Sequence, residues 1–224
     1  MAAPTLSAAV WDNLAMTPRF RLLLATLVGL AILLGTGAAL LWRHSVAPVD
    51  LLTGTYMAPA RPLPDFSLID QTGRAFGPER LKGHWSLVFF GYTNCPDFCP
   101  TTLTTLAAME KRLLNAHAAV HPRVVFVSVD AQRDTPAQLA RYVPYFDPEF
   151  LGVTAQDQKT VEAFAAKLGV AVVLTPQPGG GYSVDHSGAI FVVSPAAKLQ
   201  AVLTGPFSAS ALTTDIERIA AAGG

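Results

Sequence analysis

Cysteine and charge are scarce in this chain of 224 residues. Two cysteines are too few for the disulfide framework of a small secreted domain, and a chain of this length does not need one. Only 14% of the residues are charged and 51% are hydrophobic, which excludes intrinsic disorder and a coiled coil. The 16 basic and 16 acidic residues cancel, so no charge excess indicates a nucleic acid or another polyanion as partner. The length predicts one folded domain with an additional segment.

One long stretch lacks charge altogether. Residues 22–42 form an uncharged run (LLLATLVGLAILLGTGAALLW) that would extend about 30 Å as a helix, which matches the hydrocarbon core of a bilayer. Arg19 and Arg21 precede the run, Arg43 follows it, and Trp42 stands where interfacial aromatic residues are common. The alternative is a cleaved signal peptide, whose apolar stretch is usually only about 7–15 residues long. We therefore predict one uncleaved transmembrane helix.

This helix divides the sequence into parts. We expect a short N-terminal segment at 1–21, the transmembrane anchor at 22–42, a proline-bearing extended linker at 43–60 and one folded domain at 61–224. Two arginines before the anchor against one after it favour a cytoplasmic N-terminus. The folded domain would then lie on the far side of the membrane.

Within the folded domain, strand-like and helix-like patterns alternate. Continuous apolar or closely spaced apolar runs predict strands at 85–92, 124–129, 189–193 and 199–203, the last two forming a hairpin. Helical periodicity predicts helices at 101–117, 136–146 (interrupted at Pro144), 159–168 and 208–222. The glycine-rich loop at 176–181 is expected to be mobile. Together these elements predict an α/β fold in which helices pack on a sheet.

The two cysteines lie four residues apart, after a predicted strand and at the start of a predicted helix. Cys95 and Cys99 belong to the segment GYTNCPDFCPTTL, and Pro100 suits the first helical position, which places Cys99 near the helix N-cap. Unpaired N–H groups at a helix start favour a thiolate, so a lowered cysteine pKa is expected there. The spacing is compatible with a structural disulfide, a redox pair or a metal site, and it does not decide among them.

A histidine near the cysteines would favour a metal site. His44, His84, His117 and His121 occupy juxtamembrane, turn or helix-end segments and are most simply solvated surface residues. His186 differs, because it precedes the apolar run AIFVV, although a lone histidine is more often structural than a ligand. Two thiolates and one imidazole would suit copper, particularly Cu(I), whereas a closed zinc site needs a fourth protein ligand.

Four segments in this order resemble the Sco/SenC family of membrane-anchored copper chaperones: PDFSLIDQTGRAF, LKGHWSLVFFGYTNCPDFCPTTL, FVSVDAQRDTP and YSVDHSGAIFVVSP. The resemblance covers the chain from about Arg61 to the C-terminal helix. It implies a thioredoxin-like fold, with a central mixed β-sheet flanked by helices. It also implies a role in assembling the binuclear copper centre of cytochrome c oxidase.

The resemblance also assigns residues. Cys95, Cys99 and His186 match the family's ligands for copper, as Cu(I) or Cu(II), and Asp130 matches an acidic residue near the metal. The pair Arg133–Asp134 matches the RDTP motif, which we expect to support the loop rather than to bind copper.

By resemblance, the protein is expected to be a metallochaperone rather than an enzyme. Its expected partners are the copper-receiving subunit of cytochrome c oxidase and, as a second candidate, another copper chaperone. The alternative is a thiol–disulfide oxidoreductase that uses Cys95 and Cys99 to keep the cysteines of an oxidase subunit or another copper protein reduced. Anchor and resemblance together predict a single-pass protein of the bacterial inner membrane, with its C-terminal domain in the periplasm.

Overall fold

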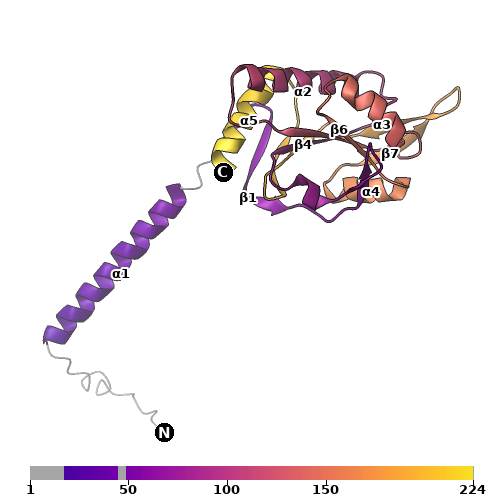
Figure 1. Cartoon of the computed structure of the whole chain (residues 1–224). Helices are drawn as coiled ribbons and strands as arrows, with labels where there is room; N and C mark the ends of the chain where they lie inside the picture. The colour runs from indigo at the N-terminus through magenta and orange to yellow at the C-terminus, as the bar shows by residue number, and fades with distance from the viewer. Residues whose placement is uncertain (1–17, 45–48, 224) are drawn as a thin grey trace, which may run out of the picture. The chain divides into compact units, whose positions relative to one another are not determined.

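The structure, a computed structural model, describes residues 18–44 and 49–223 (Figure 1). It divides the chain into two compact units. The first contains the helix α1 (Pro18–His44), and the second contains all the other described elements.

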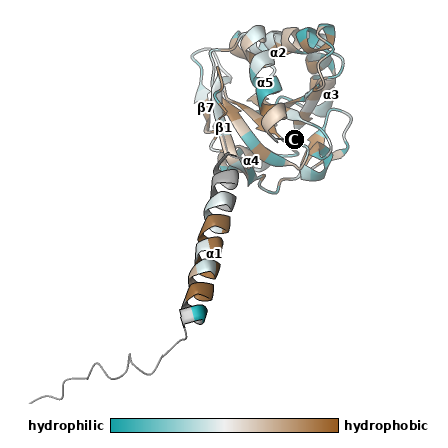
Figure 2. Ribbon diagram, turned by 90° about the vertical axis from the view of Figure 1, so that its left-hand side faces the viewer, coloured by the Kyte–Doolittle hydropathy of each residue, from teal (hydrophilic) through white to brown (hydrophobic). Residues whose placement is uncertain are grey.

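Helix α1 includes the whole uncharged run at 22–42. Its ribbon is largely apolar in Figure 2, and side chains such as Leu22 and Leu33 are exposed. Nothing is described of the side chains at 38–44. In the part of the chain that the structure describes, no helix has both the length and the apolarity needed to cross a membrane. The transmembrane anchor therefore stays a prediction.

An eight-stranded mixed sheet forms the centre of the second unit. In order across the sheet, its strands are β1 (Gly54–Pro62), β10 (Lys198–Leu203), β9 (Ile190–Val193), β4 (Ser86–Gly91), β5 (Arg123–Ser128), β6 (Leu151–Thr154), β2 (Leu68–Asp70) and β3 (Ala75–Phe76). β4, β5 and β6 run parallel, and the other pairs are antiparallel. All six residues of β4 are buried, because helices cover both faces of the sheet. The predicted strands at 85–92 and 124–129 and the hairpin of 189–193 with 199–203 are thus confirmed.

Helices lie on both faces of this sheet (Figure 1). α2 (Phe98–Asn115) and α5 (Ala209–Gly223) cover one face, and α4 (Gln158–Lys167) covers the other. α3 (Pro136–Tyr142) contacts β6. The predicted helix at 136–146 continues after Tyr142 only as a 3-10 turn, η3 (Val143–Tyr145), because Pro144 lacks an N–H and disfavours helical backbone before it. A second 3-10 turn, η2 (Pro78–Leu81), precedes β4.

A separate two-stranded antiparallel sheet projects from the domain (Figure 1). It consists of β7 (Val172–Pro176) and β8 (Tyr182–His186), joined by the turn at 177–181. Neither strand was predicted from the sequence, because both are short and only partly apolar. The expected loop at 176–181 is the turn of this hairpin, and its mobility stays a prediction.

The C-terminal part of the segment predicted as a linker belongs to the sheet. The linker was expected at 43–60, but 54–62 form the edge strand β1, which pairs with β10. This strand was not predicted, because its prolines, Pro59 and Pro62, are typical of a linker. An edge strand tolerates proline, because only one of its sides has to donate N–H groups to a neighbour.

The buried carboxylate of Asp215 connects α5 to the chain just before β1. It accepts hydrogen bonds from the backbone N–H groups of Leu52 (2.7 Å) and Thr53 (2.8 Å) and from the Thr53 hydroxyl (2.7 Å). Three donors replace the water that a buried carboxylate loses. This contact fixes the start of the folded domain.

We expect Asp215→Ala to lower the free energy of unfolding by about 2–4 kcal/mol, because it leaves the two buried donors of Thr53 and the part-buried N–H of Leu52 without an acceptor. Urea unfolding of the full chain, followed by circular dichroism, measures this change. Glu217→Ala is the matched control, since it removes an exposed carboxylate from the same helix. Equal losses in the two variants would contradict the prediction.

Candidate metal centre

Strand β4 and helix α2 place the two cysteines. Cys95 lies in the loop between them, and Cys99 lies in the first turn of α2, which begins at Phe98 rather than at Thr101. Pro100 is therefore the third helical residue and not the first. It is tolerated there because the N–H groups of the first turn have no partner inside the helix.

The start of α2 acts on Cys95. The backbone N–H of Cys99 donates to the Cys95 sulfur at 3.4 Å, so an N–H of the first turn stabilises that sulfur. The Cys99 side chain is fully buried, and this burial raises the pKa of the Cys99 thiol far above its ordinary value. The expected lowering of the pKa is wrong for Cys99, because desolvation outweighs the effect of the helix start.

His186 reaches the cysteines from the end of β8. Its Nε2 lies 3.7 Å from the Cys99 Sγ, and its Nδ1 lies 3.0 Å from the carbonyl oxygen of Ser187. Because a carbonyl oxygen only accepts, Nδ1 carries the proton and Nε2 presents its lone pair to the sulfur. Burial lowers the pKa of His186, so the imidazole is neutral at pH 7, which is the form that binds metals. The fold thus brings together two residues that are 87 positions apart.

Gly91 makes room for the Cys99 sulfur. A Cβ atom at this position would lie 2.9 Å from the Sγ of Cys99 and 2.5 Å from a ring carbon of Phe126. Both neighbours are completely buried, so neither can move aside easily. The end of β4 therefore requires glycine for the sulfur to take its place.

The buried carboxylate of Asp134 holds the cysteine loop. It accepts hydrogen bonds from the backbone N–H of Thr93 (2.9 Å), the Thr93 hydroxyl (2.6 Å) and the Ser128 hydroxyl (2.6 Å). Thr93 is two residues before Cys95, and Ser128 is the last residue of β5. Asp134 therefore joins the loop to the sheet, as expected of the Arg133–Asp134 pair.

Both carboxylate oxygens of Asp130 have partners from the hairpin and the adjoining turn. One of its carboxylate oxygens pairs with the guanidinium of Arg133, and the other accepts a hydrogen bond from the Tyr182 hydroxyl at 2.8 Å. The backbone N–H of Asp130 donates to the Ser128 hydroxyl. Its carboxylate is thus engaged beside the hairpin, and its role as an auxiliary ligand stays a prediction.

The three predicted ligands come together only in part. Cys99 and His186 face each other, while the Cys95 sulfur accepts the N–H of Cys99. Across residues 18–44 and 49–223, no three His, Cys, Asp or Glu side chains already have a metal-holding arrangement. Both cysteines are free thiols.

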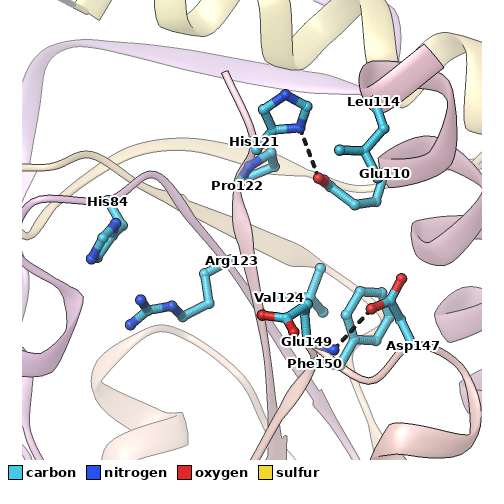
Figure 3. A pocket seen from close by; sticks show the side chains of 10 residues that line it. All are labelled: His84, Glu110, Leu114, His121, Pro122, Arg123, Val124, Asp147, Glu149 and Phe150. Atoms are coloured by element: carbon cyan, nitrogen blue, oxygen red, sulfur yellow. Dashed lines mark hydrogen bonds and ion pairs between the residues drawn. The ribbon is translucent and has the colours of Figure 1, made fainter. Parts of the chain in front are cut away.

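Three other histidines lie away from the cysteines. His84 and His121 line a cavity of about 290 Å³ that also contains Glu110, whose carboxylate lies 2.9 Å from the His121 Nδ1 (Figure 3). His117 is exposed where α2 ends. All three are exposed surface residues, as predicted. The side chain of His44 lies outside the described residues.

Comparison with known proteins gives consistent matches. The family model described as SCO1/SenC matches residues 55–221. The SCO2-like protein of Rickettsia conorii is 33% identical over 171 residues, which are 75% of this chain and 82% of that protein. The copper-bound structure of ScoI from Arabidopsis thaliana has a TM-score of 0.67 and 30% identity, and the match covers 70% of this chain and 97% of that chain.

A more distant match shows the fold alone. BsSco, described as a member of the Sco family of cytochrome c oxidase assembly proteins, has a TM-score of 0.58 and 22% identity, over 77% of this chain and 98% of that chain. The mixed sheet and its helices are thus the thioredoxin-like fold of the Sco structures. This confirms the fold class expected for the folded domain.

We expect Asp134→Ala to expose Cys99. In a Cys95→Ser background, the reaction of Cys99 with a water-soluble aromatic disulfide should become roughly tenfold faster or more, since each lost hydrogen bond contributes about 1 kcal/mol and about 1.4 kcal/mol is a factor of ten. The absorbance of the released thiolate measures the rate. Asp157→Ala is the control, because this exposed aspartate caps α4. Identical rates in both variants would refute the holding role of Asp134.

Proposed function

The chain belongs to the SCO1/SenC family, and on this basis we propose that it is a copper chaperone for cytochrome c oxidase. It binds copper through Cys95, Cys99 and His186 and delivers it to the copper-receiving subunit. The observation that carries the proposal is the approach of the His186 Nε2 lone pair to the buried Cys99 sulfur. The copper-bound ScoI of Arabidopsis thaliana, which shares this fold, supports the choice of metal.

The chemistry of the donor set favours copper. Two soft sulfur ligands and one imidazole suit three-coordinate Cu(I), whereas a closed zinc site would need a fourth protein ligand. The Cys99 thiol has a raised pKa, so copper has to displace its proton on binding. The affinity for Cu(I) should therefore fall as the pH is lowered, because protons compete for the same sulfur.

The arrangement of the ligands suits transfer of the metal. Cys95 is partly exposed, and the neighbouring Phe98 has 47% of its surface exposed, while Cys99 is fully buried. An incoming partner cysteine would therefore meet copper on the side of Cys95. Ligands from three different elements can be replaced one after another, so release does not require the domain to unfold.

The location of the protein is part of the proposal. The uncharged run at 22–42 in the sequence, with arginines on both sides of it, is the basis for proposing a transmembrane anchor there. The folded domain would then face the periplasm from the bacterial inner membrane. There it would meet the copper-receiving subunit of the oxidase and, as a second candidate partner, another copper chaperone.

A thiol–disulfide oxidoreductase is the second candidate function. The partly exposed Cys95, whose sulfur accepts the N–H of Cys99, favours it. The Cys95 thiolate would attack a partner disulfide, and Cys99 would then displace the partner from the mixed disulfide. The partner would leave as a dithiol, and this chain would hold the disulfide. His186 has no necessary role in these steps.

Anaerobic Cu(I) titration of the full chain tests the copper proposal. Cys95→Ala and Cys99→Ala should abolish tight one-to-one binding, because each removes a thiolate. His186→Ala should weaken Cu(II) binding more than Cu(I) binding, because imidazole is the harder ligand. Competition with a chromophoric chelator measures the affinities.

His121→Ala is the matched control, since this exposed histidine pairs with Glu110 away from the cysteines. Full affinity in either cysteine variant would refute the copper proposal. The oxidoreductase would be favoured instead if the chain binds no copper and its His186→Ala variant still reduces partner disulfides.

A further inference from the structure

His186 is the last of a row of side chains that face the domain from β8. Tyr182, Val184 and His186 are each two residues apart and so share one face of the strand. Val184 is only 3% exposed, whereas Asp185 on the opposite face is exposed. Within the described chain, β7 and β8 pair only with each other, and β7 also contacts α4. The position of His186 therefore depends strongly on the contacts that Tyr182 and Val184 make with the rest of the domain.

Arg133 holds the first member of the row. Its Nη1 donates to the carbonyl oxygen of Tyr182 at 2.9 Å, and its guanidinium carbon lies 3.8 Å from the centre of the Tyr182 ring. Its Nε pairs with the carboxylate of Asp130, which also accepts a hydrogen bond from the Tyr182 hydroxyl. Asp130 is completely buried, so its charge is compensated inside the protein by these two partners.

The same guanidinium lies close to the cysteine site. Its carbon is 5.8 Å from the centre of the Tyr92 ring, and that ring meets the His186 ring edge-on at 6.1 Å. Nε2 of His186 is in turn 3.7 Å from the Cys99 sulfur. A continuous series of contacts thus leads from Tyr182 through Arg133 and Tyr92 to His186.

We propose that Arg133 is a positioning residue for His186. Together with Asp130 and Tyr182, it keeps the β7–β8 hairpin against the domain, so that Nε2 stays in front of the Cys99 sulfur. Lysine cannot replace it, because only the planar guanidinium reaches the carboxylate, the carbonyl oxygen and the ring at once. The effect of Arg133 on copper binding rests on the function proposed above, whereas its positioning of His186 does not.

Hydrogen exchange of the full chain without copper tests the positioning directly. Arg133→Lys should accelerate exchange of the β8 amides by about tenfold or more and leave those of β4 and β5 unchanged, because only the hairpin is released. Tyr182→Phe should do the same to a smaller extent, since it removes only the hydroxyl. Arg141→Lys is the matched control, because this exposed arginine bonds only to Gln138 in its own helix.

Copper binding gives a second and independent readout. Arg133→Lys should weaken Cu(II) binding by about 10- to 100-fold and reduce the nitrogen hyperfine signal of the imidazole in the electron paramagnetic resonance spectrum. One-to-one Cu(I) binding should remain. If Arg133 acts through His186, the double variant Arg133→Lys/His186→Ala should bind Cu(II) no more weakly than His186→Ala alone.

Two results would overturn the inference. The first is unchanged exchange of β8 in both Arg133→Lys and Tyr182→Phe. The second is additive loss of Cu(II) affinity in the double variant, which would mean that Arg133 does not act through His186. If the wild-type chain fails to bind copper, the proposed function fails, and hydrogen exchange still decides the positioning role. If Arg133→Lys does not fold, Tyr182→Phe provides the decisive exchange measurement.

Discussion

The short turn from Asp130 to Asp134 is the element on which the whole candidate site depends. Its backbone is closed by the N–H groups of Arg133 and Asp134, which both donate to the Asp130 carbonyl oxygen. Asp134 then holds the cysteine loop through Thr93, while Asp130 and Arg133 hold the hairpin through Tyr182. Both carboxylates are fully buried, so each has to keep its hydrogen-bond partners. One turn therefore contacts both the loop that carries Cys95 and the hairpin that carries His186.

Burial, more than the helix start, sets the electrostatics of this site. It raises the pKa of the Cys99 thiol and lowers the pKa of His186, so that both groups are neutral around pH 7. A neutral thiol and a neutral imidazole can be buried at little cost, and in the proposed function copper would exchange for the thiol proton. Cys95 remains partly exposed, with its sulfur facing a backbone N–H. The pair thus combines one buried sulfur with one that a partner can reach, as the proposed transfer of copper requires.

Different parts of the fold could be predicted from the sequence to different degrees. β4 and β5 were found because strands buried on both faces form continuous apolar runs, and α2 was found from its apolar stripe. β1 was missed because its prolines suggested a linker, and β7 and β8 because short, partly polar strands give little signal. Cys95 and Cys99 were singled out by their spacing and His186 by its place before an apolar run, but the choice of these three as copper ligands needed the family resemblance. The place of Tyr182 could be read from the sequence. It lies two residues before Val184 and four before His186, so the three side chains share one face of a strand.

Apolar periodicity and local motifs are properties of neighbouring residues, so the amino-acid order was enough to predict the alternation of strands and helices, the cysteine pair after β4 and the family. Three features became visible only in the folded chain: His186 faces Cys99, Cys99 is buried in the first turn of α2, and Asp130 contacts Arg133 and Tyr182. These contacts join segments that are distant in the chain. They depend on desolvation and on the path of the backbone, and neither can be predicted from a local pattern of residues.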